Sequence, residues 1–388
     1  MRVAYNASPL LHPLTGVGHH TRELARALIA SSEVQLFLFY ASVWTDRVLG
    51  VEDLVTFRAQ PTPLRTFVRR AVRPLGTIPR LARAIQQWHF SRGPSAQTVL
   101  YHEPNFLPYR FRFGPTVVTV HDLSWIHYPE TQSPERVREM RRLFPLSLKR
   151  ADHFIAVSEF GRRDMIDTLG VDPSRITAVP NGVTSAFAPR DRGQSQATLT
   201  AHGLDWGRYA LCVGTLEPRK NLEAALRAHA QLPERLQREL PLAIVGMRGW
   251  RTSSLEAALR PRVEAGTVKP LGYVLESDLP HIYAGALALV YPSLYEGFGL
   301  PPLEAMASGT PVIVSNRSSL PEVVGSAGIL VEPDDHATIA EALQRLLDDH
   351  TYRARMVQAG LLRAAEYSWE RSARETLTVY RHVLEACR

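Results

Sequence analysis

The chain has 388 residues, of which 45% are hydrophobic and 21% charged, a composition typical of a soluble globular protein long enough for two domains. Two cysteines exclude a disulfide framework, so a reducing cytosol is the default. Residues 1–190 hold 24 Lys and Arg against 15 Asp and Glu, whereas residues 191–388 hold 21 against 23. Either an anionic partner (a lipid surface, a phosphorylated acceptor or nucleic acid) binds the first half, or these arginines only solubilise the protein.

No segment predicts export or membrane insertion. The N-terminus enters a strand-like run at once, which argues against a signal peptide. The longest apolar stretch, 284–292, is too short for the roughly 20 residues of a spanning helix. We therefore expect a cytoplasmic protein, with at most peripheral contact to the inner face of the membrane.

Short apolar runs rich in β-branched residues alternate with amphipathic stretches along the chain, which predicts parallel α/β structure. In the first half the predicted strands are 3–7, 34–40, 99–102, 116–121, 154–157 and 176–179, with a helix at 21–30. In the second half the predicted strands are 209–214, 242–245, 268–271, 287–291, 312–314 and 329–331. The helices predicted among them are 222–231, 277–284 and 337–347.

The polar stretch 189–204 is rich in Gln, Ser and Thr and lacks a clear period, so it is the predicted linker. It divides the chain into an N-terminal Rossmann-like domain, 1–190, and a C-terminal one, 191–366. The tail, 367–388, contains a predicted helix at 369–384 that is expected to cross back onto the first domain. The predicted fold is α/β, with two doubly wound domains that face a central cleft at the carboxyl ends of their strands.

The most informative stretch, 291–307, reads YPSLYEGFGLPPLEAMA. An apolar strand is followed by a glycine-containing loop, and two prolines mark the start of a helix. Backbone N–H groups at such a terminus are a ready site for a diphosphate. Gly297 and Gly299 allow the backbone to approach a ligand closely. Glu296 and Glu304 can accept hydrogen bonds from ligand hydroxyls.

A second block, 214–221, reads GTLEPRKN and follows another predicted strand. Arg219 and Lys220 can neutralise a pyrophosphate, Arg as a fork of donors and Lys as a point charge. Where a phosphate leaves during a reaction, fixed cations aimed at it stabilise the transition state more than the ground state. The alternative is that both residues are solvated at a helix start, although cations are unfavourable there.

These blocks resemble motifs of the retaining glycosyltransferases of family 4, which have the two-Rossmann architecture called GT-B. The resemblance rests on the seven residues between Glu296 and Glu304 and on the turn that begins at Gly214. His121 at a strand end and the Thr-Gly-Val-Gly loop that contains Gly16 also resemble family motifs. The four blocks stand in the family's order and cover nearly the whole chain.

The resemblance implies that the C-terminal domain binds the nucleotide sugar and that the N-terminal domain binds the acceptor. Glu304 would hold the ribose, Glu296 the donor sugar, and His121 the same sugar from the opposite domain, while Gly16 and Gly18 approach the phosphate or the acceptor. The nucleobase would lie at 272–274. The implied catalytic residues are Glu296, His121, Lys220 and Arg219. The implied donor-binding residues are Gly16, Gly18, Gly214, Thr215, Arg219, Lys220, Val274, Glu296, Gly297, Phe298, Gly299, Leu300 and Glu304.

The implied reaction transfers a hexose from a nucleotide sugar to a hydroxyl with retention of configuration, with the leaving phosphate as the base. The sequence contains no Asp-x-Asp triplet, so no metal and no cofactor are expected, and Lys and Arg replace the metal. The two donor blocks most resemble bacterial mannosyltransferases, and related deoxysugar transferases, that build surface polysaccharides such as lipopolysaccharide. This favours GDP-mannose as donor and a glycan or lipid-linked acceptor.

The alternatives are a GT-B epimerase or phosphorylase, or a non-catalytic protein that binds a sugar nucleotide. The intact carboxylates and cations favour transfer, and a phosphorylase would need a cofactor-binding lysine region and usually a longer chain. Nucleic-acid binding would explain the charge, but no aromatic-interleaved basic motif occurs. Asp122 is a candidate cap of the turn that follows it, and its role stays open.

Residues 54–102 contain eight arginines and no Asp or Glu. Within 64–90, apolar residues fall on one helical face and arginines along another side. A basic amphipathic helix with an aromatic anchor suits the headgroup region of an anionic membrane. The alternative is that the apolar residues pack on the sheet and leave the arginines solvated. The candidate membrane residues are Arg65, Arg69, Arg70, Arg73 and Trp88.

Overall fold

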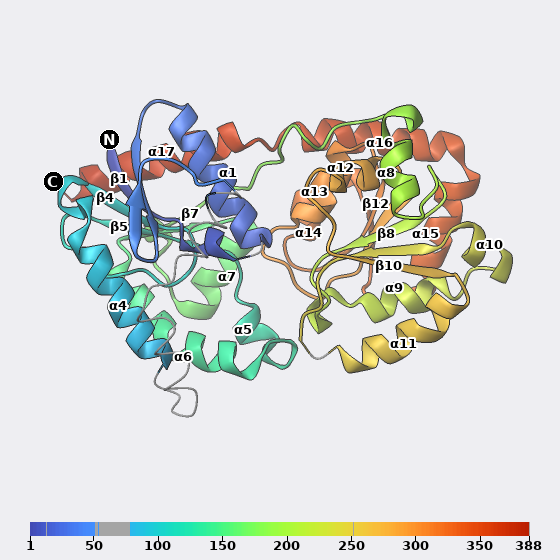
Figure 1. Ribbon diagram of the computed structural model, residues 1–388, viewed down its shortest axis with the longest axis horizontal. Coiled ribbons are helices and arrows are strands. Elements are labelled where there is room, and N and C mark those ends of the chain that lie inside the picture. The colour runs from blue at the N-terminus through green and yellow to red at the C-terminus, as the bar shows by residue number, and fades with distance from the viewer. Residues whose placement is uncertain (13, 51–52, 54–77, 251, 388) are drawn as a thin grey trace.

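The computed structural model describes residues 1–388 except 13, 51–52, 54–77, 251 and 388. Two α/β domains lie side by side, and each is built on one mainly parallel sheet (Figure 1). The predicted fold class, two Rossmann-like doubly wound domains, is confirmed.

Among its described residues, the first domain contains seven strands. They are β1 (Arg2–Asn6), β2 (Gln35–Tyr40), β3 (Val43–Thr45), β4 (Leu100–Glu103), β5 (Thr116–Val120), β6 (His153–Ala156) and β7 (Ile176–Ala178). Their order is β3-β2-β1-β4-β5-β6-β7, and of the pairs that these seven strands form, β2–β3 is antiparallel and the others are parallel. The α-helices that the structure describes in this domain are α1 (Gly16–Ala30), α4 (Ile78–Arg92), α5 (Ser124–His127), α6 (Pro134–Arg150) and α7 (Glu159–Leu169). Every residue of β5 is buried, as expected for a central strand covered on both faces.

The second domain contains six parallel strands in the part of the chain that the structure describes. They are β8 (Ala210–Val213), β9 (Leu242–Val245), β10 (Val268–Gly272), β11 (Ala288–Tyr291), β12 (Val312–Ser315) and β13 (Ile329–Val331), in the order β10-β9-β8-β11-β12-β13. The first helices are α8 (Arg192–Ala201), α9 (Leu222–His229), α10 (Glu234–Glu239), α11 (Ser253–Glu264) and α12 (Leu279–Ala284). The others are α13 (Leu300–Ala307), α14 (Leu320–Val324), α15 (His336–Asp348) and α16 (His350–Ala364).

The last helix, α17 (Trp369–Ala386), packs on the first domain and lies beside α1 (Figure 1). Trp369, Leu377 and Tyr380 belong to the same buried core as the strands β1 and β2. The Tyr380 hydroxyl also lies 2.6 Å from Nδ1 of the buried His102. The chain therefore crosses between the domains twice. After the second crossing, apolar side chains of α17 pack in the core of the first domain, together with those of β1 and β2.

Several elements differ from the sequence prediction or were absent from it, among them the helices α6, α7 and α16. Three others show why. The predicted linker contains α8, which starts at a capping box formed by Asp191 and Gln194. Helix α1 begins at Gly16, five residues earlier than its apolar period indicates. The short strand β3 was not predicted. In each case local hydrogen bonds or sheet pairing form the element without a clear apolar pattern.

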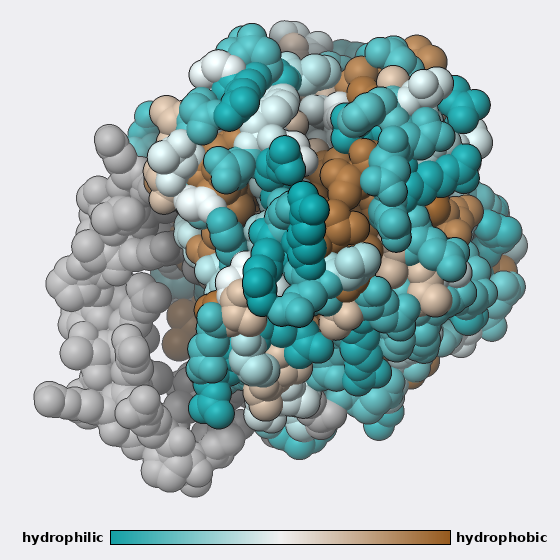
Figure 2. Space-filling model, turned by 90° about the vertical axis from the view of Figure 1, so that its right-hand side faces the viewer, coloured by the Kyte–Doolittle hydropathy of each residue, from teal (hydrophilic) through white to brown (hydrophobic). Residues whose placement is uncertain are grey.

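The end of the molecule formed by the C-terminal domain is covered mainly by hydrophilic side chains, and hydrophobic residues show between them in small areas (Figure 2). Such a surface is typical of a face in contact with water. Among the described residues, no helix combines the length and the apolar character needed to cross a membrane.

Candidate functional site

The two motif loops of the C-terminal domain meet at the middle of its sheet. β8 and β11 are neighbours, and the loops that follow them, 214–221 and 292–299, leave the same carboxyl edge. The Leu294 amide donates to the Arg219 carbonyl at 2.9 Å, which ties one loop to the other. Between these two strands the chain changes sides of the sheet, and this switch point is where α/β sheets usually bind ligands.

Glu296 is the centre of a buried charge network. Its carboxylate accepts from Arg219 Nη1 at 3.0 Å and Lys220 Nζ at 2.7 Å, and the Tyr291 hydroxyl donates to it at 2.9 Å. Glu217 accepts from Arg219 Nη2 at 2.6 Å. Burial would raise the pKa of Glu296, but the two cations outweigh it and lower the pKa to about 2. Glu296 is therefore ionised at neutral pH, and two carboxylates balance the two cations.

Gly214 begins the loop that carries the lysine of this network, and it lies beside that side chain. Its φ of +147° favours glycine, and a Cβ at this position would lie 3.4 Å from Lys220 Cε. Thr215 follows as a partly buried residue of the same loop. The backbone of the loop can therefore come close to a ligand that binds the lysine.

The start of α13 offers fewer backbone donors than the sequence implies. Gly299 precedes the helix with a φ of +118°, and no side chain caps this terminus. Pro301 and Pro302 lack N–H groups. The amides of Gly299 and Leu300 are therefore the donors that this terminus can present to a phosphate.

Glu304 lies in α13, about one turn into the helix. The Tyr283 hydroxyl donates to its Oε2 at 2.9 Å. Burial raises the pKa of Glu304 to about 7. Its carboxylate can accept further hydrogen bonds, and its charge changes near neutral pH.

His121 directly follows β5 and meets the C-terminal domain. Its Nε2 lies 2.8 Å from the Pro104 carbonyl, so this nitrogen carries the proton and Nδ1 keeps a lone pair. Burial lowers the pKa of His121, which keeps the ring neutral at pH 7. A Cβ on Gly297 would lie 1.6 Å from the His121 carbonyl oxygen, and Ser158 Oγ donates to the Gly297 carbonyl at 2.7 Å. The structure thus brings His121 against the loop that carries Glu296.

The N-terminal glycine block is a helix start, which corrects the predicted loop. Gly16 and Gly18 lie in the first turn of α1, and the N-cap Thr15 makes no side-chain capping bond. A Cβ on Gly16 would lie 3.9 Å from Leu300 Cδ1, so this terminus faces the start of α13 across the cleft. A Cβ on Gly18 would instead lie 2.8 Å from the Leu14 side chain. Gly16 is therefore the glycine that faces the donor block.

Two predicted donor-binding side chains point into the core. Val274 and Phe298 are 6% and 5% exposed and belong to the buried cluster of the C-terminal domain. Their backbone can still face a ligand, as the resemblance implies for the nucleobase region. Tyr273 and Leu275, on either side of Val274, are 55% and 60% exposed.

Two family models match the chain. The model for "Glycosyltransferase Family 4" matches residues 14–187, and the model for "Glycosyl transferases group 1" matches residues 203–363. The O-antigen chain mannosyltransferase B of Escherichia coli is 36% identical over 388 aligned residues, which cover 98% of this chain and 100% of that protein. The chain belongs to the glycosyltransferases of family 4. This confirms the predicted family and enzyme class and sets aside the epimerase, phosphorylase and non-catalytic alternatives.

Two solved structures share the GT-B fold of this glycosyltransferase. Sucrose-phosphate synthase from Thermosynechococcus elongatus has a TM-score of 0.71 at 22% identity, and the alignment covers 99% of each chain. HepE from Anabaena, in complex with UDP and glucose, has a TM-score of 0.69 at 18% identity, with 98% of this chain and 99% of that chain covered. The likeness extends over both domains.

In this glycosyltransferase, contacts between the domains surround the motif residues. The Tyr295 hydroxyl donates to Asp164 at 2.5 Å and accepts from the Leu123 amide at 3.2 Å. Glu322 accepts from two amides at the start of α7, each at 2.8 Å. Asp122 accepts from the amide and hydroxyl of Ser124 and so caps the turn into α5. The Asp122 cap lies within one domain and agrees with the candidate role that the sequence indicated. The sequence could not assign the partners of Tyr295 and Glu322, because spacing along one domain does not reveal which surface of the other domain faces it.

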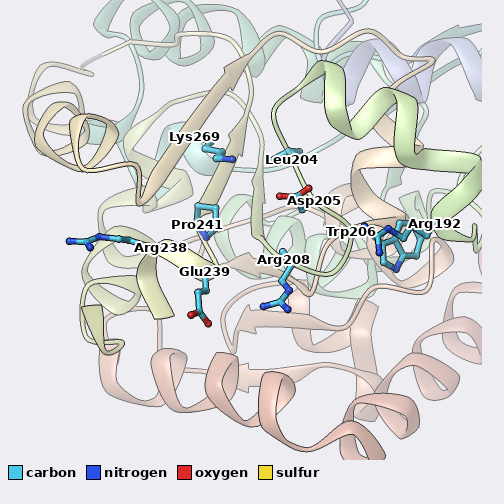
Figure 3. Close-up of a pocket in the computed structure, with 9 residues that line it drawn as sticks. All are labelled: Arg192, Leu204, Asp205, Trp206, Arg208, Arg238, Glu239, Pro241 and Lys269. Carbon is cyan, nitrogen blue, oxygen red and sulfur yellow. The ribbon is translucent and has the colours of Figure 1, made fainter. Parts of the chain in front are cut away.

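A polar hollow of about 430 Å³ lies elsewhere on the glycosyltransferase, at the amino ends of β8, β9 and β10. Figure 3 shows Arg192 and Arg238 at opposite ends of this hollow, with Asp205 and Glu239 between them. The hollow contains none of the motif residues, and acidic side chains accompany its cations. It is not a candidate donor site.

Proposed function

We propose that this glycosyltransferase transfers mannose from GDP-mannose to a hydroxyl of a glycan or lipid-linked acceptor in the synthesis of a bacterial surface polysaccharide. The observation that carries the proposal is the 36% identity, over the full length of both chains, with a protein named O-antigen chain mannosyltransferase B. The clustered cations and carboxylates at the switch point of the second sheet support it, because a nucleotide sugar requires both kinds of group.

In the proposed binding step, the donor pyrophosphate partly replaces the Glu296 carboxylate as the partner of Arg219 and Lys220. Arg219 and Lys220 lie within 3.0 Å of the Glu296 carboxylate, and the donor pyrophosphate would take over part of this contact. Glu296 would then accept hydrogen bonds from the sugar hydroxyls, and Glu304 from the ribose. His121 would offer its Nδ1 lone pair, or its backbone carbonyl, to the sugar from the acceptor domain.

The proposed chemistry retains the anomeric configuration. As the bond between the anomeric carbon and the phosphate oxygen breaks, negative charge grows on the leaving phosphate. Arg219 and Lys220 stabilise that charge, and the phosphate oxygen accepts the proton of the attacking acceptor hydroxyl on the same face of the sugar. No metal takes part in this scheme, since Lys and Arg supply the positive charge.

The test is transfer from GDP-mannose in excess EDTA, followed by NMR of the product. We expect turnover to persist within about twofold of the untreated enzyme, because protein cations act where a metal would otherwise act. We also expect an α-linked product from the α-linked donor. A strict need for a divalent metal, or an inverted anomer, would contradict the mechanism, and activity only with other nucleotide sugars would contradict the donor.

The pKa of Glu304 predicts a pH-dependent donor affinity. The ionised carboxylate accepts ribose hydroxyls better than the acid does, and its pKa is raised to about 7. The KM for GDP-mannose should therefore rise as the pH falls from about 8 to about 6. Glu304→Gln should give a KM about tenfold higher than wild type at pH 8, since it loses a charge-assisted hydrogen bond. The KM of Glu304→Gln should vary little with pH, because glutamine does not titrate. A wild-type KM that stays constant between about pH 6 and about pH 8 would contradict the assignment of Glu304 to the ribose.

We also propose that residues 64–90 contact an anionic membrane surface. Arg65, Arg69, Arg70 and Arg73 lie outside the described residues, whereas Trp88 lies in α4 and is half exposed. Each arginine near anionic lipid contributes about 1 kcal/mol, so four would localise the protein reversibly.

Liposome flotation tests the contact. Changing the four arginines to glutamine should greatly reduce flotation with anionic vesicles, while neutral vesicles bind neither protein. Equal flotation of both proteins, or none by wild type, would exclude this segment as a membrane contact.

A further inference from the structure

A groove of about 490 Å³ lies on the first domain between α4 and α6, which are neighbours at the lower left of Figure 1. It lies outside the cleft that holds the motif residues. Its charged lining residues are Arg83, Arg110, Arg142, Arg150 and Glu139. Positive charge therefore exceeds negative charge in the groove.

Two of these arginines are fixed by backbone oxygens. Arg83 Nη2 donates to the Leu107 carbonyl at 2.8 Å and the Pro108 carbonyl at 3.2 Å, and Arg150 Nη1 donates to the Pro108 carbonyl at 3.1 Å. The two guanidiniums share one oxygen and so lie close together with like charge. Burial lowers the pKa of Arg150, and the charges of Arg110 and Arg83 lower it further.

Arg110 and Arg142 are exposed, and neither forms an ion pair with an acidic side chain in the part of the chain that the structure describes. The backbone of Arg110 is nevertheless held in place, because its amide donates to Gln87 Oε1 at 2.7 Å and its carbonyl accepts from Gln87 Nε2 at 3.1 Å. Glu139 forms no ion pair with the described residues either. An anion among these guanidiniums would relieve their mutual repulsion.

The groove also has an apolar side and a short path to the cleft. Leu143 and Leu146 line it, and Leu146 is 42% exposed. The loop that holds Arg83 through Pro108 begins at Pro104, whose carbonyl accepts from His121. Four residues span at most about 14 Å. A phosphate in the groove could therefore be joined to a sugar in the cleft by a short glycan.

We propose that this groove binds the phosphate or diphosphate of the lipid that carries the acceptor glycan, with the guanidiniums on the phosphate and the leucines on the first carbons of the lipid. Guanidinium forks match phosphate oxygens in geometry and charge. The inference rests on the proposed function, because it assumes that the acceptor is a glycan linked to a lipid. The groove would bind the lipid end of that acceptor, while the glycan end enters the cleft.

The test uses the double variant Arg110→Gln and Arg142→Gln in the full chain, because both side chains are exposed and neither holds the fold. The matched control is Arg208→Gln with Arg238→Gln, two exposed arginines of the polar hollow in Figure 3. The probe is flotation with vesicles of equal parts phosphatidylglycerol and phosphatidylcholine. Each arginine near anionic lipid changes partitioning by about fivefold, so the groove variant should bind about 30-fold more weakly than wild type. The control should bind as wild type does.

Equal flotation of the groove variant and the control would overturn the proposal. A second arm titrates wild type and the groove variant with inorganic pyrophosphate alone. If pyrophosphate binding depends on Arg110 and Arg142 while vesicle binding does not, the groove takes a soluble phosphate, and the lipid assignment is wrong. Vesicle binding needs no donor, so it can be measured independently of mannosyl transfer. If the wild type transfers no mannose, the proposed function is contradicted. If the groove variant then still binds vesicles more weakly than wild type, the groove remains supported as a site for anionic lipid.

Discussion

Lys220→Ala is expected to lower the turnover of mannosyl transfer by about 10²–10³-fold, because a group that stabilises developing charge in an enclosed site is worth that much. Lys220 Nζ lies 2.7 Å from Glu296 and 2.6 Å from the Tyr291 hydroxyl, so it is fixed before the donor binds. Its charge therefore needs no reorganisation as the phosphate leaves. The measurement is kcat with GDP-mannose at saturating acceptor.

The control for this variant is Lys149→Ala, which removes an exposed lysine from the end of α6. It should keep the turnover of wild type. Lys220→Ala should remain folded, because Arg219 and Tyr291 still hold the Glu296 carboxylate. A folded variant with near wild-type turnover would show that Lys220 does not act on the phosphate.

Most strands of this glycosyltransferase were predictable because they are buried and parallel. β11 and β12 have no exposed residue, so each is an apolar run with a clear end. Helix α8 was missed because its stability comes from the Asp191–Gln194 capping box and two buried residues. The start of α1 was missed because glycines usually mark a turn, whereas here they form the first turn of a helix.

The sequence assigned Arg219, Lys220 and Glu296 to one donor site, but it did not indicate that the two cations would pair with the carboxylate. Each residue comes just after a predicted strand, and the carboxyl ends of parallel strands share one edge of a sheet. Tyr291 and Glu217 belong to the same recognised blocks, but no spacing indicated that they would complete the charge network. Whether Tyr291 and Glu217 reach Glu296 and Arg219 depends on the directions of their side chains in the folded loops.

The contacts between the domains could not be predicted. Glu322 accepts from the first amides of α7 in the other domain, although 162 residues separate Phe160 from this carboxylate. Neither the segment around Glu322 nor the start of α7 has a sequence pattern that indicates which residues it contacts. Sequence patterns report which face of an element is buried, and the packing of two domains decides what covers it.

Gly297→Ala is the second variant for which we expect a large effect, a loss of turnover of at least about 10²-fold. The φ of Gly297 is not positive, so the backbone itself accepts alanine. The obstacle is the His121 carbonyl oxygen, which would lie 1.6 Å from the new Cβ, whereas an ordinary contact is 3.4 Å or more. The two domains must move apart at this point, and a misplacement of about 1 Å in a site of this kind costs about 10² in rate.

The nucleotide should still bind to Gly297→Ala, because the cations and both motif glutamates belong to the C-terminal domain. We therefore expect a GDP-mannose Kd within about threefold of wild type, since those contacts are unchanged. Small-angle scattering should show a larger radius of gyration. Gly50→Ala is the matched control, because among the described residues the nearest neighbour of a Cβ there is the Asp53 carboxylate, at 3.7 Å. If Gly297→Ala instead transfers mannose as fast as wild type, the close approach of His121 to this loop is not needed for catalysis. If it loses GDP-mannose binding, the substitution acts on the donor loop itself rather than on the closure of the two domains.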